Sequence, residues 1–180
     1  RMIPRKTREK AGAGKLETRN LKLLIMQNET LIHQFYQAFQ RGDAEGMAAC
    51  YHSDIEFEDP AFGRLRGKEV GAMWAMLIDR SKGQLQITYS DVKADGQKGQ
   101  AYWEARYAFS QTKRQVHNKI NAQFQFKDGK IIAHRDQFSF WKWTIMALGL
   151  PGILLGWTPF LKNKVRTQVR KALTRFQSMK

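Results

Sequence analysis

The sequence predicts an α+β domain, in which three helices pack on one face of a mostly antiparallel sheet. Apolar residues recur with helical spacing up to about residue 80 and alternate with polar residues from about residue 85 onward. Helices followed by a run of strands are typical of α+β folds. The length fits as well, because 180 residues suffice for one domain with its own core and for extensions at both ends.

Three stretches have the spacing of a helix. The first covers residues 17–41, and Gly42 suits the position just after a helix end. Asp43 is then the expected N-cap of a short second helix that extends to about Tyr51. The third helix is expected over residues 68–80, with apolar residues every three or four positions.

Strands are expected where apolar and polar residues alternate, at residues 53–59, 85–89, 103–109, 116–126 and 132–140. Asp128-Gly129 is a strong hairpin signal between the last two. The glycines at 63 and 67 are expected to bracket a loop. In the last strand one face carries five residues: Ile132, His134, Asp136, Phe138 and Phe140.

The net charge of +15 lies mainly at the two ends of the chain. Residues 1–25 hold eight Lys or Arg and two Glu, whereas residues 141–180 hold eight Lys or Arg and no acidic residue. The middle is nearly neutral, so no specific nucleic-acid site is indicated. Basic ends can bind polyanions or anionic lipid, or act only as solubilising tails.

These differences divide the chain into three parts. Residues 1–25 form a basic extension, disordered or helical, and residues 1–20 are expected to be mostly disordered. Residues 26–142 form the α+β domain. Residues 143–180 begin with an uncharged stretch broken by Gly and Pro and end as a basic amphipathic helix. This last part could wrap the domain or a dimer partner, or make a weak contact with an anionic membrane surface.

Residue usage gives little sign of a cofactor. Cys50 is the only cysteine, so an intrachain disulfide is impossible and a cytoplasmic setting is expected. The four histidines have no close ligand spacing, so no metal is expected. The sequence contains no glycine-rich phosphate loop, no G-x-S-x-G and no C-x-x-C.

A strand that ends in an inward-facing carboxylate is the strongest candidate for chemistry. Ile55, Phe57 and Asp59 share one side of the strand, and Pro60 ends it because proline lacks the backbone N–H. A carboxylate that faces a core loses hydration, which raises its pKa toward the range that a general base needs near neutrality. The alternative is a structural aspartate that accepts backbone N–H bonds at the strand end.

The last strand supplies a second pair of polar groups. His134 and Asp136 are two residues apart and therefore project from the same apolar face. Such groups are costly to bury unless they are paired or open to a cavity. They form either a second acid–base pair or a buried pair that only fixes the core.

Several segments resemble the nuclear transport factor two-like superfamily, namely residues 35–43 (FYQAFQRGD), 51–54 (YHSD) and 57–63 (FEDPAFG). Residues 103–107 (WEARY) and 134–138 (HRDQF) are similar to the SnoaL-like polyketide cyclases of that superfamily. The resemblance covers about residues 28–142. It implies a cone-shaped α+β fold with a curved sheet, and a homodimer formed through the outer face of the sheet.

The resemblance also implies roles for individual residues. The aspartate of the Glu-Asp-Pro segment is the proton-shuttling base of ketosteroid isomerases, which implies that role for Asp59. The oxyanion tyrosine and aspartate of those isomerases fall on Phe35 and Ala122, so a steroid isomerase is not expected. Some SnoaL-like cyclases place an acid–base aspartate on a late strand, which Asp136 matches by its face.

Two functions are consistent with these observations. The first is binding of a small, mostly apolar molecule with cofactor-free proton transfer, by an isomerase, cyclase or hydratase. Asp59 would be the base, and His134 with Asp136 a second acid–base pair. The second is a non-catalytic module that binds a ligand or a partner. The expected pocket residues are Phe35, Trp74, Trp103, Tyr107, Asn118 and Phe138.

Overall fold

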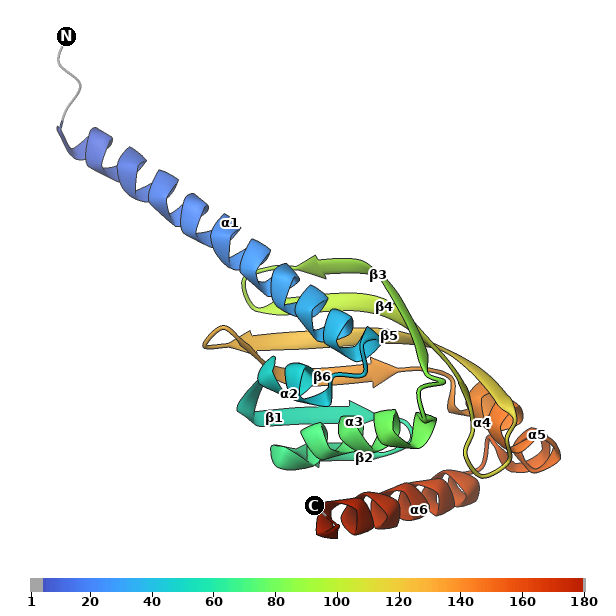
Figure 1. Cartoon of the computed structure of the whole chain (residues 1–180). Helices are drawn as coiled ribbons and strands as arrows, with labels where there is room; N and C mark the ends of the chain where they lie inside the picture. The colour runs from blue at the N-terminus through green and yellow to red at the C-terminus, as the bar shows by residue number, and fades with distance from the viewer. Residues whose placement is uncertain (1–4, 180) are drawn as a thin grey trace.

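The computed structural model describes the backbone of residues 5–179 and the side chains of residues 16–179 (Figure 1). The elements in chain order are α1 (Arg5–Gln40), α2 (Ala44–Ala49), β1 (Tyr51–Asp59), β2 (Gly63–Arg66), α3 (Lys68–Ser81), β3 (Gln86–Ala94), β4 (Lys98–Ala108), β5 (Gln115–Lys127), β6 (Lys130–Gln137), α4 (Phe140–Leu148), α5 (Leu150–Leu155) and α6 (Pro159–Ser178). The α+β class is confirmed.

One curved sheet of six strands, in the order β2-β1-β6-β5-β4-β3, forms the body of the fold. The pairing of β1 with β6 is parallel and the other four pairings are antiparallel. Helices α1, α2 and α3 cover one face of this sheet, while α4 and α5 lie at one end (Figure 1). The arrangement is the cone-shaped fold that the sequence predicts.

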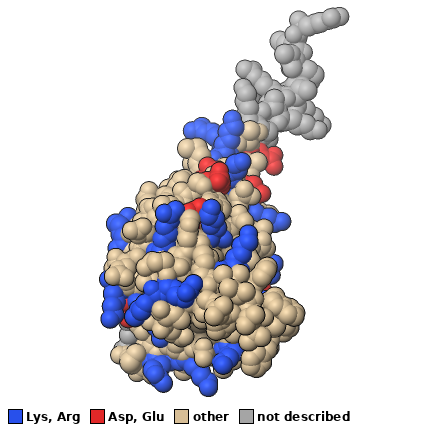
Figure 2. All heavy atoms as spheres, turned by 90° about the vertical axis from the view of Figure 1, so that its right-hand side faces the viewer, with Lys and Arg blue, Asp and Glu red and all other residues tan. Residues whose placement is uncertain are grey.

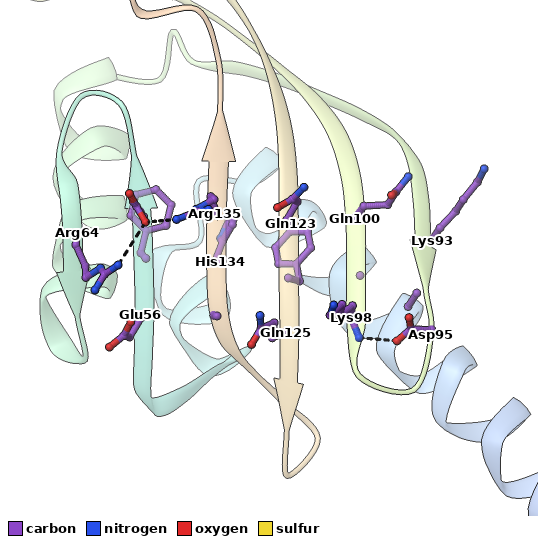
Figure 3. A pocket seen from close by; sticks show the side chains of 16 residues that line it. Glu56, Arg64, Lys93, Asp95, Lys98, Gln100, Gln123, Gln125, His134 and Arg135 are labelled. Atoms are coloured by element: carbon purple, nitrogen blue, oxygen red, sulfur yellow. Dashed lines mark hydrogen bonds and ion pairs between the residues drawn. The ribbon is translucent and has the colours of Figure 1, made fainter. Parts of the chain in front are cut away.

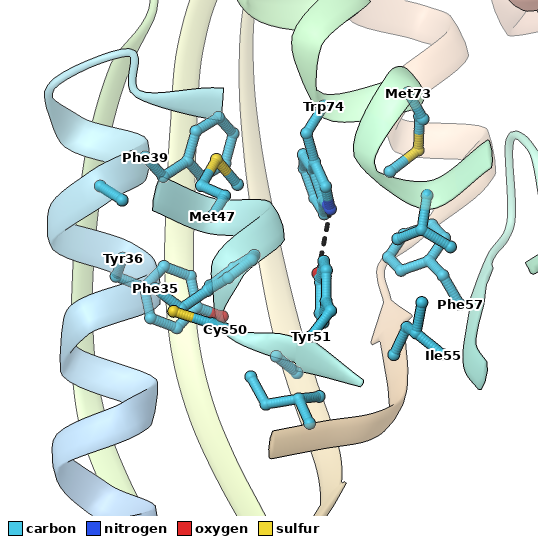
Figure 4. Packing of buried hydrophobic residues seen from close by; sticks show 14 of the residues in the cluster. Phe35, Tyr36, Phe39, Met47, Cys50, Tyr51, Ile55, Phe57, Met73 and Trp74 are labelled. Carbon is cyan, nitrogen blue, oxygen red and sulfur yellow. Dashed lines mark hydrogen bonds between the residues drawn. The ribbon is translucent and has the colours of Figure 1, made fainter. Parts of the chain in front are cut away.

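The core lies between these helices and the inner face of the sheet. Its largest fully buried side chains include Phe35 and Tyr36 of α1, Met47 of α2, Phe57 of β1 and Phe124 of β5 (Figure 4). Full burial of each such apolar side chain contributes on the order of 1.5–3 kcal/mol. The rows of aromatic residues therefore hold the three helices against the sheet.

The N-terminal helices begin and end for local reasons. Gly42 follows α1 with a φ of 69°, a conformation that costs glycine little. The Asp43 side chain caps α2 by accepting from the Gly46 N–H at 2.7 Å, as predicted. The start of α1 differs from the expectation, because the helix already begins at Arg5. Residues 5–20 consist mostly of good helix formers and contain no proline, which favours the helical alternative there.

Four local predictions in the strands also need correction. The last strand ends at Gln137, so Phe138 and Phe140 lie outside it and Phe140 begins α4. Residues 63–66 form the edge strand β2 rather than a loop. Tyr51 is the first residue of β1 and not part of α2, which ends at Ala49. In β6 the buried isoleucine is Ile131 rather than Ile132, because a register irregularity between β5 and β6 shifts the alternation.

The C-terminal extension packs on the domain. Helix α6 buries the predicted row of apolar side chains, including Val165, Leu173 and Phe176. The Arg170 guanidinium donates to the backbone carbonyls of Phe62, at 3.1 Å, and of Arg64, and so fastens α6 to the turn between β1 and β2. In the described part of the chain, no helix is both long and apolar enough to span a bilayer.

Candidate functional site

A cavity of about 180 Å³ lies between the inner face of the sheet, α3 and the C-terminal helices. Most of its wall is apolar, from Phe57, Trp74 and Trp103 in the domain to Trp143 and Val169 in the extension. Its polar groups include Asp59, Tyr107, Asn118, Asp136 and Gln168. Apolar walls with a few converging polar groups are the usual composition of a small-molecule site.

Asp59 lies in the cavity wall at the end of β1. Its Oδ1 accepts from the Phe62 backbone N–H at 2.5 Å, within the tight turn that leads to β2. Burial raises the pKa of its carboxyl to about 7, and the nearby charge of Asp136 adds to this rise. Hydrogen bonds from the backbone of Phe62, Ala61 and Gly63 act in the opposite direction, but they are outweighed by burial. The group can therefore exchange a proton near neutral pH.

Asp136 is held by side chains rather than by backbone. Its Oδ1 accepts from the indole Nε1–H of Trp103 at 3.1 Å and lies 3.0 Å from Nε2 of His134. His134 is 1% exposed and Asp136 3% exposed. The predicted pair is therefore a real hydrogen-bonded contact, and only Asp136 of the two opens on the cavity.

The polar chain continues behind His134. Its Nδ1 lies 2.8 Å from the Tyr51 hydroxyl, and that hydroxyl accepts from the Trp74 indole N–H at 2.9 Å (Figure 4). The Asp136 carboxylate can only accept, so the matching tautomer of His134 carries its proton on Nε2 and accepts from the Tyr51 hydroxyl at Nδ1. Every member of this buried chain thus has a partner, which is the condition for stable polar burial.

Two hydrogen-bond donors face the same cavity from β4 and β5. Ala105 pairs with Asn118 and Tyr107 with Val116, so Tyr107 and Asn118 are diagonal neighbours on the inner face. The Tyr107 oxygen accepts from the Trp143 indole N–H at 2.9 Å, which leaves its hydrogen to a ligand oxygen. Burial raises the pKa of Tyr107 to about 12, so the phenol keeps that proton.

The structure brings together most of the predicted site residues. The cavity is lined by Asp59, Asp136, Trp74, Trp103, Tyr107, Asn118 and Phe138. Phe35 lies elsewhere than expected: it is fully buried and packs against Tyr51 and His134, because the helical row that carries it faces the core. His134 also stays behind the wall.

Sequence reasoning missed the contribution of the C-terminal extension. Trp143 of α4 and Gln168, Val169 and Ala172 of α6 line the cavity, so its wall is not confined to residues 26–142. The apolar row of α6 was the available signal, but the row alone does not tell what it covers. Tyr51 was missed as the link between His134 and Trp74.

A second hollow, of about 720 Å³, lies on the outer face of the sheet and has a different character. Charged and amide side chains dominate it, among them Arg64, Lys98, Gln123 and Arg135 (Figure 3). Arg135 pairs with Glu58 at 2.7 Å across β1 and β6. Within the described residues, no group of three or more His, Cys, Asp or Glu could hold a metal ion.

The cone of helices on a curved sheet, with polar groups inside an apolar cavity, defines the class of nuclear transport factor two-like proteins. Within that class, the SnoaL-like domain family matches residues 32–134. The match covers more than half of the chain, and the protein belongs to this family. No curated protein matches the sequence.

Solved structures share the fold. A polyketide cyclase candidate from Xanthomonas campestris pv. campestris has a TM-score of 0.56 at 19% identity, over 68% of this chain and 98% of its own. An LEH-like epoxide hydrolase from M. tuberculosis has a TM-score of 0.52 at 21% identity, over 76% and 96%. An NTF2-like protein from Burkholderia pseudomallei K96243 has a TM-score of 0.57 at 15% identity, over 68% and 98%. At such identities the likeness establishes the fold.

Proposed function

We propose that the protein binds a small, mostly apolar molecule in the inner cavity and catalyses cofactor-free proton transfer on it. The observation that carries the proposal is that Asp59 and Asp136 line one apolar cavity together with Tyr107 and Asn118. The cavity of about 180 Å³ lies below the ~300–1,000 Å³ of pockets for drug-sized ligands, which favours a small substrate.

Each polar group has a role that its surroundings support. Asp59, with a pKa of about 7, is the general base that takes a proton from the bound molecule or from water. Tyr107 and Asn118 donate hydrogen bonds to the oxygen on which negative charge develops. Asp136 is the second acid–base group, and His134 acts through it because His134 does not reach the cavity. The resulting reaction class is isomerisation, cyclisation or hydration.

Proton exchange in deuterated water tests the catalytic role. Wild-type protein is incubated with a panel of small cyclic ketones, and deuterium at the carbon next to the carbonyl is followed by mass spectrometry. Asp59→Asn should slow exchange by about 10²–10⁴-fold, and Tyr107→Phe by about 10–10³-fold. Asp54→Asn is the matched control, because Asp54 is an exposed carboxylate on the same strand. Equal exchange by Asp59→Asn and wild type would contradict the proposal.

The second candidate is a non-catalytic binding module of the same fold. The hydrogen bond from the Phe62 backbone N–H to Asp59 favours this second candidate, because an aspartate with a purely structural role at a strand end would accept the same bond. Mass spectrometry of the intact purified protein detects molecules that it retains. A ligand that binds wild type and Asp59→Asn equally, with no exchange by either, would favour this module over the enzyme.

The proposal includes a homodimer formed through the outer face of the sheet. The open hollow there, with its mixed charges and amides, suits a wet and partly polar interface. Sedimentation at micromolar concentration should give twice the chain mass of 20.9 kDa. A single species at the chain mass would contradict the dimer.

A further inference from the structure

The C-terminal end of the protein exposes a cluster of large apolar side chains. Leu150 is 73% exposed, Leu154 67%, Trp157 71% and Phe160 67%. Trp141 is close by, since its ring lies against Gly156. We call Trp141, Leu150, Leu154, Trp157 and Phe160 the C-terminal cluster. Isolated exposed apolar residues are ordinary, whereas several large ones so close together in the chain indicate an interaction surface.

Close contacts at two glycines explain why the side chains of the C-terminal cluster face solvent. A Cβ at Gly152 would lie 2.0 Å from the Thr144 carbonyl oxygen, and one at Gly156 would lie 2.1 Å from the Thr144 hydroxyl. The backbone of α5 therefore lies directly on α4, as only glycine allows. Because the chain contacts α4 at Gly152 and at Gly156, the C-cap of α5, the leucines of α5 are left facing solvent. The exposure is thus a property of the packed structure and not of a frayed end.

Basic side chains surround the cluster. Residues 141–180 hold eight Lys or Arg and no Asp or Glu, and Lys162 and Lys164 lie two and four positions after Phe160. The loop between β4 and β5 adds Arg114, whose Nε donates to the Met146 carbonyl at 2.9 Å. Figure 2 faces this end of the molecule and shows Lys and Arg side chains around a surface without charged residues. The combination is a hydrophobic centre within a positive border.

We propose that the C-terminal cluster docks the protein on the surface of a bilayer that contains anionic phospholipid. Trp141 suits the headgroup level, where an aromatic ring with one polar N–H is favoured. Trp157, whose N–H donates to the Leu154 carbonyl at 3.2 Å, adds an exposed aromatic ring. The lysines attract anionic headgroups while the leucines and Phe160 enter the acyl boundary. A second copy of this surface fits less well, because two positive borders without acidic residues repel each other. The docking does not depend on the inner cavity being occupied.

Vesicle flotation with the full chain tests the proposal. The wild type should float with vesicles of phosphatidylcholine mixed with phosphatidylglycerol, and not with phosphatidylcholine alone. Leu154→Ser/Trp157→Ser should lower the bound fraction by about tenfold or more. Lys162→Gln/Lys164→Gln should weaken binding and reduce its dependence on salt. Thermal melts of each variant check that the fold is unchanged.

Matched controls separate this surface from other exposed groups. Leu23→Ser/Met26→Ser removes comparably exposed apolar residues from α1, and Lys68→Gln/Lys127→Gln removes two exposed charges from the domain. Both should bind like wild type. The proposal is overturned if wild type does not float, if the Leu154/Trp157 variant floats equally, or if the controls lose as much. It is also overturned if sedimentation shows that the Leu154/Trp157 variant breaks a dimer, because the cluster would then be an interface between copies.

Discussion

Asp59 and Asp136 line the same cavity, yet the structure holds them in different ways. Asp136 is held by the side chains of His134 and Trp103, and the chain of contacts continues to Tyr51 and Trp74. Asp59 is held by the backbone of the turn that follows it in sequence. The first arrangement depends on several distant residues being in place. The second depends only on the backbone of the adjacent turn.

This difference separates stability from chemistry. A carboxylate inside a complete side-chain network is costly to disturb, because the loss of one partner leaves another buried group unsatisfied. A carboxyl group that faces a cavity and has a raised pKa lowers the free energy of unfolding once it is ionised. Replacing it with a neutral group removes this loss. Active sites often retain groups of the second kind at the expense of stability. The comparison therefore predicts opposite effects for substitutions in the Asp136 network and at Asp59.

The largest effect is expected from His134→Leu. It leaves Asp136 without its histidine donor and the Tyr51 hydroxyl without an acceptor, so the free energy of unfolding should fall by about 3–5 kcal/mol. Urea denaturation measures this loss. The double variant His134→Leu/Asp136→Leu should be more stable than His134→Leu, because both members of the pair are then apolar. Simple addition of the two single losses would show that the pair is not coupled.

A smaller effect of opposite sign is expected from Asp59→Asn. In the folded state this carboxyl stays protonated up to a pKa of about 7, whereas the unfolded chain releases the proton near ~3.9. The stability contributed by the protonated group is thus complete below about pH 4 and lost as the pH rises to 7. Asn does not titrate and can still accept from Phe62, so it should be more stable than wild type by about 2–4 kcal/mol at pH 8 and little different at pH 4.

Asp95 offers the matched control for this pH dependence. Backbone N–H groups of Gln97 and Lys98 lower the pKa of this exposed carboxyl, so its stabilising contribution is present above the ordinary aspartate pKa and is lost as the pH falls. Asp95→Asn should therefore destabilise the protein at neutral pH, the reverse of Asp59→Asn. Thermal melts of both variants between pH 4 and pH 8 make the comparison. A loss of about 1–3 kcal/mol for Asp59→Asn at every pH would identify Asp59 as a structural acceptor.

The same contrast explains what the sequence could predict. Asp59 was found because alternation, the inward position and the following proline all lie within a few residues of it. His134 and Asp136 were paired because they lie two apart on one strand. Tyr51 is 83 positions from His134, and the parallel pairing of β1 with β6 brings them together. No pattern within a short stretch of sequence predicts the pairing of β1 with β6.

The helices and strands also differ in how well the sequence predicts them. Helix α3 and strands β4 and β5 have a long, regular period, so their type and approximate bounds could be predicted. Strand β2 has only four residues with Leu65 and Gly63 buried, too few for an alternation to be recognised. The inward register of β6 depends on an irregularity opposite Ile131, which an ideal alternation cannot contain. The cavity wall from α6 required knowledge of where the extension folds back.

The smallest effects are expected from substitutions of two tryptophans in the cavity wall, Trp103 and Trp143. Trp103 donates its indole N–H to the buried Asp136 and Trp143 donates its own to the half-buried Tyr107. Phenylalanine removes the N–H in each case. Trp103→Phe should cost about 1.5–3 kcal/mol, because its acceptor is a carboxylate, and Trp143→Phe about 0.5–1.5 kcal/mol, because its acceptor is a neutral phenol. Urea denaturation of both variants at one pH measures the difference. Equal losses would show that the indole rings matter only through their packing, and that Asp136 does not depend on Trp103 as its network implies.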